Sequence, residues 1–209
     1  MTINYDQLFK INKTLEDFPD AKLQIVSKNR DEKTVRELIN KGYLLFGENK
    51  VQEAHEKFKN INNQNLELHL IGPLQTNKVK TALEVFNCIQ SVDRPKLVNE
   101  IAKYQNKITT KTKEFYIQIN IGKEIQKSGV HPEKVNDLYD LCIEKNLTIK
   151  GLMCIPPVEK SSSIFFEEMV SIKNKLNNKL ILSMGMSNDY KNALKCKSNM
   201  IRIGSKIFN

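Results

Sequence analysis

Short apolar runs alternate with amphipathic stretches along the whole chain of 209 residues, and this alternation is what most constrains its fold. Eight runs have the length and composition of buried strands. They span residues 23–26, 43–46, 67–71, 88–92, 115–121, 149–155, 180–184 and 200–203. The stretches between them have helical spacing, as at Val35, Leu38 and Ile39, and a further helix over about residues 5–18 precedes the first run. This order is typical of a parallel sheet covered by helices.

Residues that begin and end helices support the same division. Asp31 and Asp93 are placed as N-caps, Pro132 fits the first turn of a helix, and Gly42 fits the position just after one. No linker or repeat interrupts the series. Eight strands, each followed by a helix, favour a single (β/α)8 TIM-barrel domain over residues 1–209 with an extra N-terminal helix. The alternative is an open doubly wound sheet, because one or two miscounted strands would convert one fold into the other.

Composition and charge narrow the classes of function. Hydrophobic residues make up 40% and charged residues 27%, as in ordinary globular proteins. The net charge of +9 comes from lysines spread over all predicted helices, without a basic block, so we expect no nucleic-acid partner. The positive electrostatic field that this net charge produces favours small anionic ligands.

The chain shows no sign of a membrane or secreted protein. No apolar run approaches the length of a membrane span, and the first residues lack the layout of a secretory signal, so we expect a cytoplasmic protein. The four cysteines are scattered, without a CxxC pair or nearby histidines. This spacing argues against a zinc site or a disulfide framework and favours buried free thiols.

Nearly every predicted strand ends in a small or polar residue. In chain order these are Ser27-Lys28, Gly47-Glu48-Asn49, Gly72-Pro73, Ser91, Asn120, Met153-Cys154, Ser183 to Ser187, and Arg202-Gly204-Ser205. Turns use such residues anyway, so one of them alone means little. Together they predict a ring around the carboxyl-terminal mouth of the barrel, where barrel proteins bind their ligands.

Two cations in this ring have more than one interpretation. Lys28 is either a surface lysine at a strand end or an amine that reacts with an aldehyde, since partial desolvation favours the free amine. Arg202 is the only one of four arginines inside a strand-like run, where it shares a face with Gly204. A permanent charge there needs either a ligand or an inward carboxylate as a salt-bridge partner.

Two turns rich in glycine and serine favour anion binding. Ser187 follows the seventh run and precedes a helix, and Gly204-Ser205 follows the eighth, where we expect the same arrangement of donors. Barrels commonly bind phosphate after strands seven and eight, and the first strand of a closed barrel adjoins the eighth. A phosphorylated aldehyde would satisfy both Lys28 and these turns. No HExxH, GxSxG, Walker or GxGxxG motif is present, and His69 lacks an obvious carboxylate partner.

Nine segments in order along the chain carry a resemblance to a known family. They are VSK (26–28), FGENKVQEA (46–54), HLIGPLQTNKVK (69–80), SVD (91–93), QIN (118–120), KSGV (127–130), GLMCIPP (151–157), LSMGMSND (182–189) and RIGSKIF (202–208). The chain resembles the pyridoxal phosphate homeostasis proteins, single-domain relatives of the alanine racemase N-terminal barrel. The resemblance covers practically the whole chain.

The resemblance implies a cofactor and a role for each matching residue. Lys28 would form a Schiff base with pyridoxal 5′-phosphate (PLP), and Arg202 would face its pyridine nitrogen. The remaining candidates for cofactor binding are Ser187, Gly204 and Ser205 at the phosphate, Asn49 near the cofactor, and His69, Ser91 and Asn120. Three positions depart from the pattern expected for the family, namely Leu68, Asn209 and Lys206. Lys206 follows the phosphate turn, so it either adds charge there or points to solvent.

The same resemblance favours a binder over an enzyme. Racemases of this barrel type have a second domain that supplies a tyrosine base on the opposite face of the cofactor, and this chain ends shortly after Ser205. We therefore expect a monomeric protein of PLP homeostasis without catalytic turnover, with PLP, amino acids and transient apo-enzyme acceptors as partners. Two alternatives remain: a slow PLP enzyme acting on amino acids, and an aldolase-type barrel acting on sugar phosphates.

Overall fold

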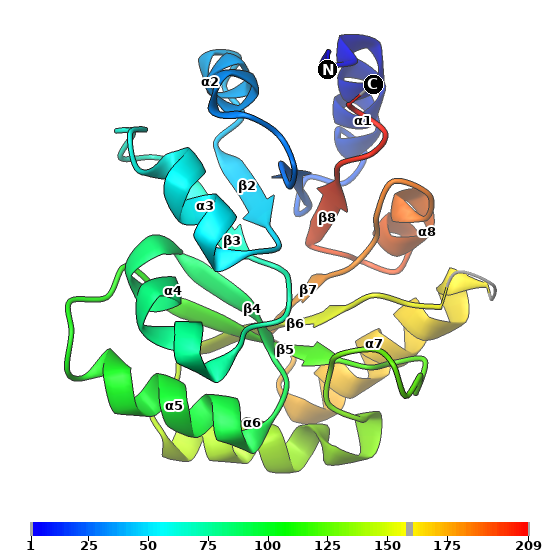
Figure 1. The fold of residues 1–209 in the computed structure, drawn as a ribbon. Helices are drawn as coiled ribbons and strands as arrows, with labels where there is room; N and C mark the ends of the chain where they lie inside the picture. Colours follow the sequence, from blue (N-terminus) through cyan, green and yellow to red (C-terminus); the bar gives the residue numbers. More distant parts are fainter. Residues whose placement is uncertain (1, 158–160, 209) are drawn as a thin grey trace.

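The computed structural model describes residues 2–157 and 161–208, and in it eight parallel strands form a closed barrel (Figure 1). Neighbouring strands pair in chain order, and β1 closes the barrel against β8. The strands are β1 (Lys22–Val26), β2 (Leu45–Glu48), β3 (Glu67–Leu70), β4 (Cys88–Val92), β5 (Glu114–Ile119), β6 (Ile149–Cys154), β7 (Ile181–Ser183) and β8 (Met200–Ile203). The predicted barrel is confirmed, and the open sheet was the wrong alternative.

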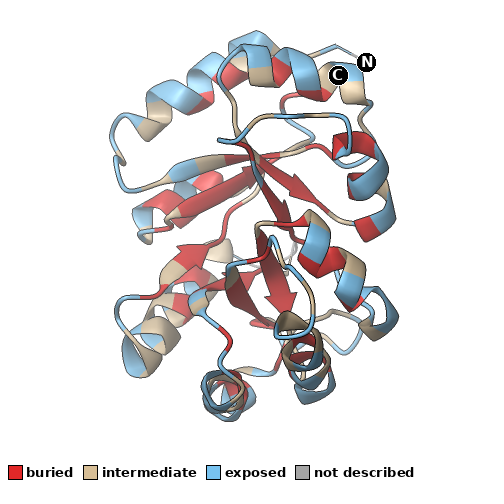
Figure 2. Ribbon diagram, turned by 90° about the vertical axis from the view of Figure 1, so that its left-hand side faces the viewer, coloured by how far each residue is buried: buried red, intermediate tan, exposed pale blue. Residues whose placement is uncertain are grey.

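Helices surround the barrel and turn their apolar faces toward it. They are α1 (Tyr5–Leu15), α2 (Glu32–Asn40), α3 (Val51–Phe58), α4 (Val79–Val85), α5 (Pro95–Gln105), α6 (Val135–Glu144), α7 (Ser162–Leu176) and α8 (Tyr190–Lys195), with short 3-10 turns η1 (Thr76–Lys78) and η2 (Pro132–Lys134). Figure 2 shows buried strands inside a layer of helices whose outer faces are exposed. The main apolar core lies between these two layers.

The expectation that each strand is followed by a helix is wrong at β8. A turn follows β8, and the extra helix α1, which precedes β1, lies beside β8 in Figure 1. Two contacts tie the ends of the chain together: an antiparallel bridge between Ile3 and Phe208, and a hydrogen bond from the Asn4 amide to the Ile207 carbonyl (2.9 Å). Leu8 of α1 is buried in the core that the other helices share.

The predicted helix boundaries hold in part. The Asp31 side chain accepts the Thr34 amide at the start of α2, and Gly42 follows that helix with φ +89°, as expected. Asp93 does not cap α5, because its carboxylate instead binds the guanidinium of Arg94, the residue at the N-cap position.

The second strand starts two residues later than predicted. The Tyr43 amide donates to the Leu38 carbonyl (3.1 Å), so Tyr43 closes the turn that follows α2, and β2 begins at Leu45. Gly47 and Glu48, predicted as the turn after this strand, lie within it and pair with His69 and Leu70 of β3.

Polar side chains occupy the middle of the barrel. Gln24, Gln90, Ser183 and Arg202 are all buried there and are joined by hydrogen bonds. All four cysteines are free, as expected, and three of them are buried. Burial raises the pKa of the Cys142 and Cys154 thiols to about 12, so both stay protonated at neutral pH.

Among the described residues, no helix combines the length and the apolar character that crossing a membrane requires.

Candidate functional site

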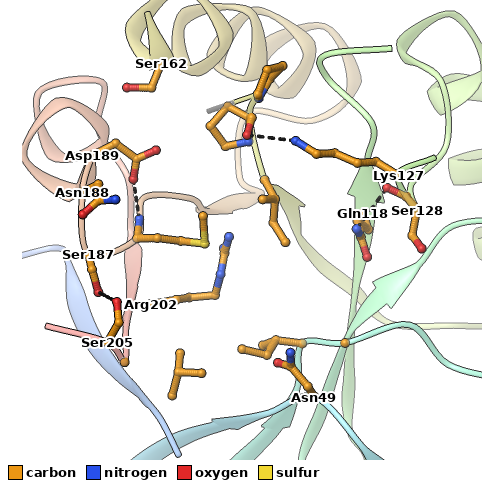
Figure 3. A pocket seen from close by; sticks show the side chains of 18 of the residues that line it. Asn49, Gln118, Lys127, Ser128, Ser162, Ser187, Asn188, Asp189, Arg202 and Ser205 are labelled. Carbon is orange, nitrogen blue, oxygen red and sulfur yellow. Dashed lines mark hydrogen bonds between the residues drawn. The ribbon is translucent and has the colours of Figure 1, made fainter. Parts of the chain in front are cut away.

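A cavity of about 760 Å³ opens at the carboxyl ends of the strands (Figure 3). It is lined from β1, β2 and β3 on one side and from β5 to β8 on the other. Six residues predicted from the sequence line it together: Lys28, Asn49, Ser187, Arg202, Gly204 and Ser205. The ring expected at this mouth is therefore present, although no residue of β4 reaches it.

Lys28 lies two residues beyond the end of β1 and lines the cavity with an exposed side chain. Among the described residues it forms no hydrogen bond and no ion pair. The expected partial desolvation of this lysine is not observed, since the mouth is open here. Its ammonium nitrogen is consequently accessible to a ligand in the cavity.

Arg202 projects from β8 into the middle of the cavity in Figure 3 and is 3% exposed. Its Nη1 donates to the carbonyl oxygen and to the Oγ of Ser183 (2.6 and 2.8 Å), and its Nη2 donates to the carbonyl of Cys154 (2.7 Å). Burial lowers the pKa of the guanidinium below its usual value, but an arginine stays charged in proteins. The salt-bridge interpretation was wrong, because Arg202 pairs with no carboxylate in the described part of the chain. The arrangement leaves a buried positive charge free for a ligand.

A hydrogen-bonded series of side chains holds Arg202 from below. The Ser183 Oγ, which accepts from Arg202, donates to Gln90 Oε1 (2.7 Å). Gln90 Nε2 in turn lies 2.8 Å from His69 Nδ1 and 3.4 Å from Gln24 Oε1. Sequence reasoning missed Gln24 and Gln90, although polar residues within strand-like runs were the available signal.

Two serine hydroxyls meet at the edge of the cavity between β7 and β8. Ser205 Oγ donates to Ser187 Oγ (3.2 Å), and the Lys206 amide points at the same oxygen (3.3 Å). The neighbouring carboxylate of Asp189 is occupied by the Met186 amide (2.6 Å). This cluster, hereafter the Ser187 cradle (Ser187, Gly204, Ser205 and Lys206), is rich in donors and suits an anion.

The helix termini expected behind these serines are absent or displaced. Helix α8 begins three residues after Ser187, with Asp189 at the N-cap position, and no helix follows Ser205 before the chain reaches Phe208. The donors of the cradle are therefore hydroxyls, a loop amide and a lysine.

The side chain of Lys206 brings an ammonium group to the cradle. Its Nζ lies 3.5 Å from the Ser187 carbonyl oxygen and 5.4 Å from the centre of the Tyr190 ring. These contacts favour the first of its two interpretations, a positive charge added to the anion site.

Gly72 brings the loop after β3 against Asn49. A Cβ at position 72 would lie 2.1 Å from the Asn49 carbonyl oxygen and 2.7 Å from its Cα, so only glycine permits this approach. Asn49 is half-buried and turns toward the cavity in Figure 3. The segments 47–49 and 71–73 thus meet at one point of the cavity wall.

Gln118 of β5 is a cavity residue without a predicted role. It is 6% exposed, and its Nε2 donates to the Ser128 carbonyl (3.1 Å). Its Oε1 is buried and has no partner among the described residues. This oxygen is an acceptor available to a ligand that carries an N–H or O–H group.

Asn120, Ser91 and His69 are not brought into the cavity lining. Asn120 binds the Glu124 carbonyl (2.7 Å) and amide (3.1 Å), so it shapes the loop after β5. Ser91 is buried in β4, and its hydroxyl has no partner among the described residues. His69 lines a smaller cavity of about 300 Å³ at the other end of the barrel. The expectation that it lacks a carboxylate partner was wrong, because its Nε2 lies 3.6 Å from a carboxylate oxygen of Glu67 at the start of β3. No described group of three or more metal-ligating side chains forms a metal site.

A cavity with an accessible lysine, a buried guanidinium and a donor-rich cradle can bind a molecule that has both a carbonyl and a phosphate group. The lysine and the cradle lie on the joined edges β1 and β8, so one small ligand can reach both.

Comparison with known proteins agrees with the fold and the motifs. The model of the alanine racemase N-terminal domain matches residues 10–209. The pyridoxal phosphate homeostasis protein of Aquifex aeolicus is 36% identical over 199 residues, and the match covers 90% of this chain and 86% of that protein. Its counterpart in Haemophilus influenzae is 38% identical over 201 residues, covering 90% of this chain and 84% of that protein.

Solved structures of the same architecture include PipY of Synechococcus elongatus. The structure without PLP has a TM-score of 0.90 at 28% identity, and the structure with PLP bound has 0.82 at 27%; both cover 98% of this chain and 99% of that one. Alanine racemase of Corynebacterium glutamicum has a TM-score of 0.71 at 16% identity, covering 98% of this chain and 60% of that one. The likeness to the racemase shows the fold alone.

Proposed function

Because the chain belongs to the family of pyridoxal phosphate homeostasis proteins, we propose that it binds PLP at the mouth of its barrel and serves PLP homeostasis. The observation that carries the proposal is one cavity that joins Lys28 of the β1 loop to Arg202 and the Ser187 cradle. PipY, which has nearly the same fold, has been solved with PLP bound.

The residues around the cavity fit this cofactor. The Ser187 cradle offers two hydroxyls, an amide and an ammonium group to a phosphate, and the nearest carboxylate is turned toward the Met186 amide. Gln118 Oε1 is a buried acceptor without a partner among the described residues, so a polar ligand would satisfy it. When bound, PLP would supply an electrophilic aldehyde carbon as the reaction partner of the Lys28 amine.

Arg202 sets the electronic character of the site. We assign it to the ring nitrogen, since its guanidinium is buried and its bonds to the Ser183 and Cys154 carbonyls fix its plane. A permanent cation opposes protonation of a nitrogen that faces it, so the ring withdraws electrons less strongly than one paired with a carboxylate. This environment suits holding the cofactor better than driving carbanion chemistry.

We extend the proposal to a binder without catalytic turnover. Racemisation needs an acid or base on each face of the cofactor. The described lining of the cavity contains no histidine, tyrosine or cysteine, and its second lysine, Lys127, pairs with Glu124 (2.5 Å) and the Pro156 carbonyl (3.2 Å). An open mouth also lets the cofactor leave, which suits a buffer or carrier.

Domain extent, partners and location complete the proposal. We assign residues 1–209 to one PLP-binding domain, acting in the cytoplasm as a monomer, with amino acids and transient apo-enzymes as further partners. The monomer is supported by the exposed large hydrophobic side chains, which are scattered over α1, the loop after β5, α6 and α7 (Tyr5, Phe9, Ile125, Ile143 and Ile164).

The first experiment adds PLP to the purified protein, records the visible absorption, reduces with borohydride and maps the labelled peptide. We expect a visible band and a single label on Lys28, both lost in Lys28→Ala. A label spread over surface lysines would refute the cofactor site and restore the sugar-phosphate barrel as the better interpretation.

A second experiment separates a binder from an enzyme. The PLP-loaded protein is incubated with amino acids in deuterated water, and exchange at Cα is followed by NMR. We expect no exchange above that of free PLP, whereas exchange abolished by Lys28→Ala would show a slow amino-acid enzyme.

A further inference from the structure

Lys28 lies between two residues that one charged cluster holds in place. The cluster consists of Ser27, Glu48 at the end of β2, and Glu53 and Lys57 of α3, and is hereafter the Lys57 cluster. The Lys28 side chain forms no hydrogen bond or ion pair with these groups. Its position therefore depends on the backbone on either side of it.

The contacts reach both neighbours of Lys28. Lys57 Nζ donates to the Ser27 carbonyl (2.7 Å), to Glu48 Oε1 (2.7 Å) and to Glu53 Oε1 (3.0 Å), which uses all three protons of the ammonium group. Ser27 Oγ donates to Glu48 Oε1 (2.7 Å). Glu53 Oε1 also accepts the amide of Asn29 (2.5 Å), a residue in the left-handed region at φ +58°.

Such a cluster is costly for the fold. Lys57 is 7% exposed and Glu48 is fully buried, and one Glu48 oxygen has no partner among the described residues. Desolvation of this kind offsets most of the attraction in a buried ion pair, and apolar replacements are often as stable. Burial raises the pKa of Glu48. Although burial acts in the same direction on Glu53, hydrogen bonds from Lys57 and the Asn29 amide hold its pKa below the usual value.

We propose that Lys57 is a positioning residue for Lys28, acting with Glu48 and Glu53 to fix the backbone of residues 27–29. The inference rests on the proposed function, in which Lys28 bonds to the aldehyde of PLP. Holding the residues on both sides leaves the amine free while limiting the directions from which it meets the aldehyde carbon. A misplacement of about 1 Å costs roughly a hundredfold in the rate of such a reaction.

The test compares Lys57→Met with Lys59→Met, a matched control at an exposed lysine two positions further along the chain. Two ligands are used: PLP, followed by the growth of its visible band, and pyridoxine 5′-phosphate, which lacks the aldehyde. We expect Lys57→Met to slow band formation by roughly ten- to a hundredfold, with unchanged affinity for pyridoxine phosphate. Lys59→Met should match the wild type with both ligands.

Other outcomes overturn the proposal in distinguishable ways. Equal losses with both ligands would show that Lys57 supports only the fold, and a wild-type rate in Lys57→Met would show that it does not position Lys28. If Lys57→Met fails to fold, Glu53→Gln must give the same separation between the ligands, because Glu53 is one-quarter exposed and holds Asn29 directly. A wild-type protein never labelled on Lys28 would overturn the proposed function, and this inference with it.

Discussion

Arg202 carries a buried charge whose hydrogen-bond acceptors are all neutral oxygens of Ser183 and Cys154. Its planar fork spans β6 and β7, and a lysine ammonium cannot reproduce that geometry. This single side chain thus joins two strands below the cavity and presents positive charge within it.

We predict that Arg202→Lys weakens PLP binding and shifts the visible band, because the charge near the ring moves. The unloaded variant should also lose about 1–3 kcal/mol of unfolding free energy, since a buried carbonyl loses its donor. Spectral titration and urea unfolding measure the two effects. An unchanged band and affinity would remove Arg202 from the cofactor site.

Lys206 adds a positive charge to the Ser187 cradle. We predict that Lys206→Met weakens PLP binding roughly fivefold at low salt, since opposite charges about 4 Å apart attract by about 1 kcal/mol in water. The difference should fade at high salt because the ammonium group is exposed. Lys191→Met, at an exposed lysine of α8, is the control; an equal loss there would point to the overall field instead.

At the scale of elements, the loops are fixed to one another by close backbone contacts, and the clearest is between Gly72 and Asn49. We predict that Gly72→Ala costs about 1–3 kcal/mol of unfolding free energy and also weakens PLP binding, because Asn49 must move. Gly42→Ala is the matched control: it strains a φ of +89° in open space, far from the cavity lining. It should lower stability alone, as urea unfolding and PLP titration of both variants would show.

The Lys57 cluster joins β2 and α3 to the β1 loop and makes that junction sensitive to acid. The folded-state pKa of Glu53 lies below its usual value of 4.5, so the folded protein binds fewer protons than the unfolded chain. The stabilisation by Glu53 is complete above pH 4.5 and is lost as the pH falls through the lower, folded-state pKa. We predict that the stability difference between wild type and Glu53→Gln shrinks over this range in urea unfolding; a constant difference would contradict the ion-pair contribution.

At the scale of the whole molecule, periodicity and the short list of polar strand ends were enough to predict the barrel. The boundaries that failed depend on which of several local hydrogen bonds forms, such as the bond of the Tyr43 amide to Leu38 of α2 and that of the Asp93 carboxylate to Arg94. Local sequence cannot show that a carboxylate prefers a neighbouring guanidinium to a helix amide.

The residues of the candidate site likewise divide into those that the sequence predicted and those that it did not. Five residues were predicted because each follows a strand, and parallel strands bring such ends together: Lys28, Asn49, Ser187, Gly204 and Ser205. Arg202 was predicted because it is an arginine within a strand-like run. Gln118 and the Lys57 cluster were not predicted. A glutamine within a strand and a lysine within an amphipathic helix are common, so neither indicates a site by itself. Their importance comes from burial and from partners distant in sequence, as with Lys57 and Ser27.

The hydrogen-bonded series through the barrel turns His69 into a built-in reporter of what the mouth holds. His69 Nδ1 accepts a hydrogen bond from Gln90 Nε2, Gln90 Oε1 accepts one from Ser183 Oγ, and Ser183 Oγ accepts one from Arg202 Nη1. A ligand that polarises the guanidinium therefore also polarises the His69 ring at the opposite end of the barrel. The other two histidines, His55 and His131, are exposed and serve as internal standards. In nitrogen-15 NMR, loading with PLP should change the chemical shifts of the His69 ring nitrogens but not those of the other two histidines. In Gln90→Leu the His69 shifts should stay unchanged on loading, while the cofactor still binds. Occupancy could then be read from a nucleus that the cofactor never touches.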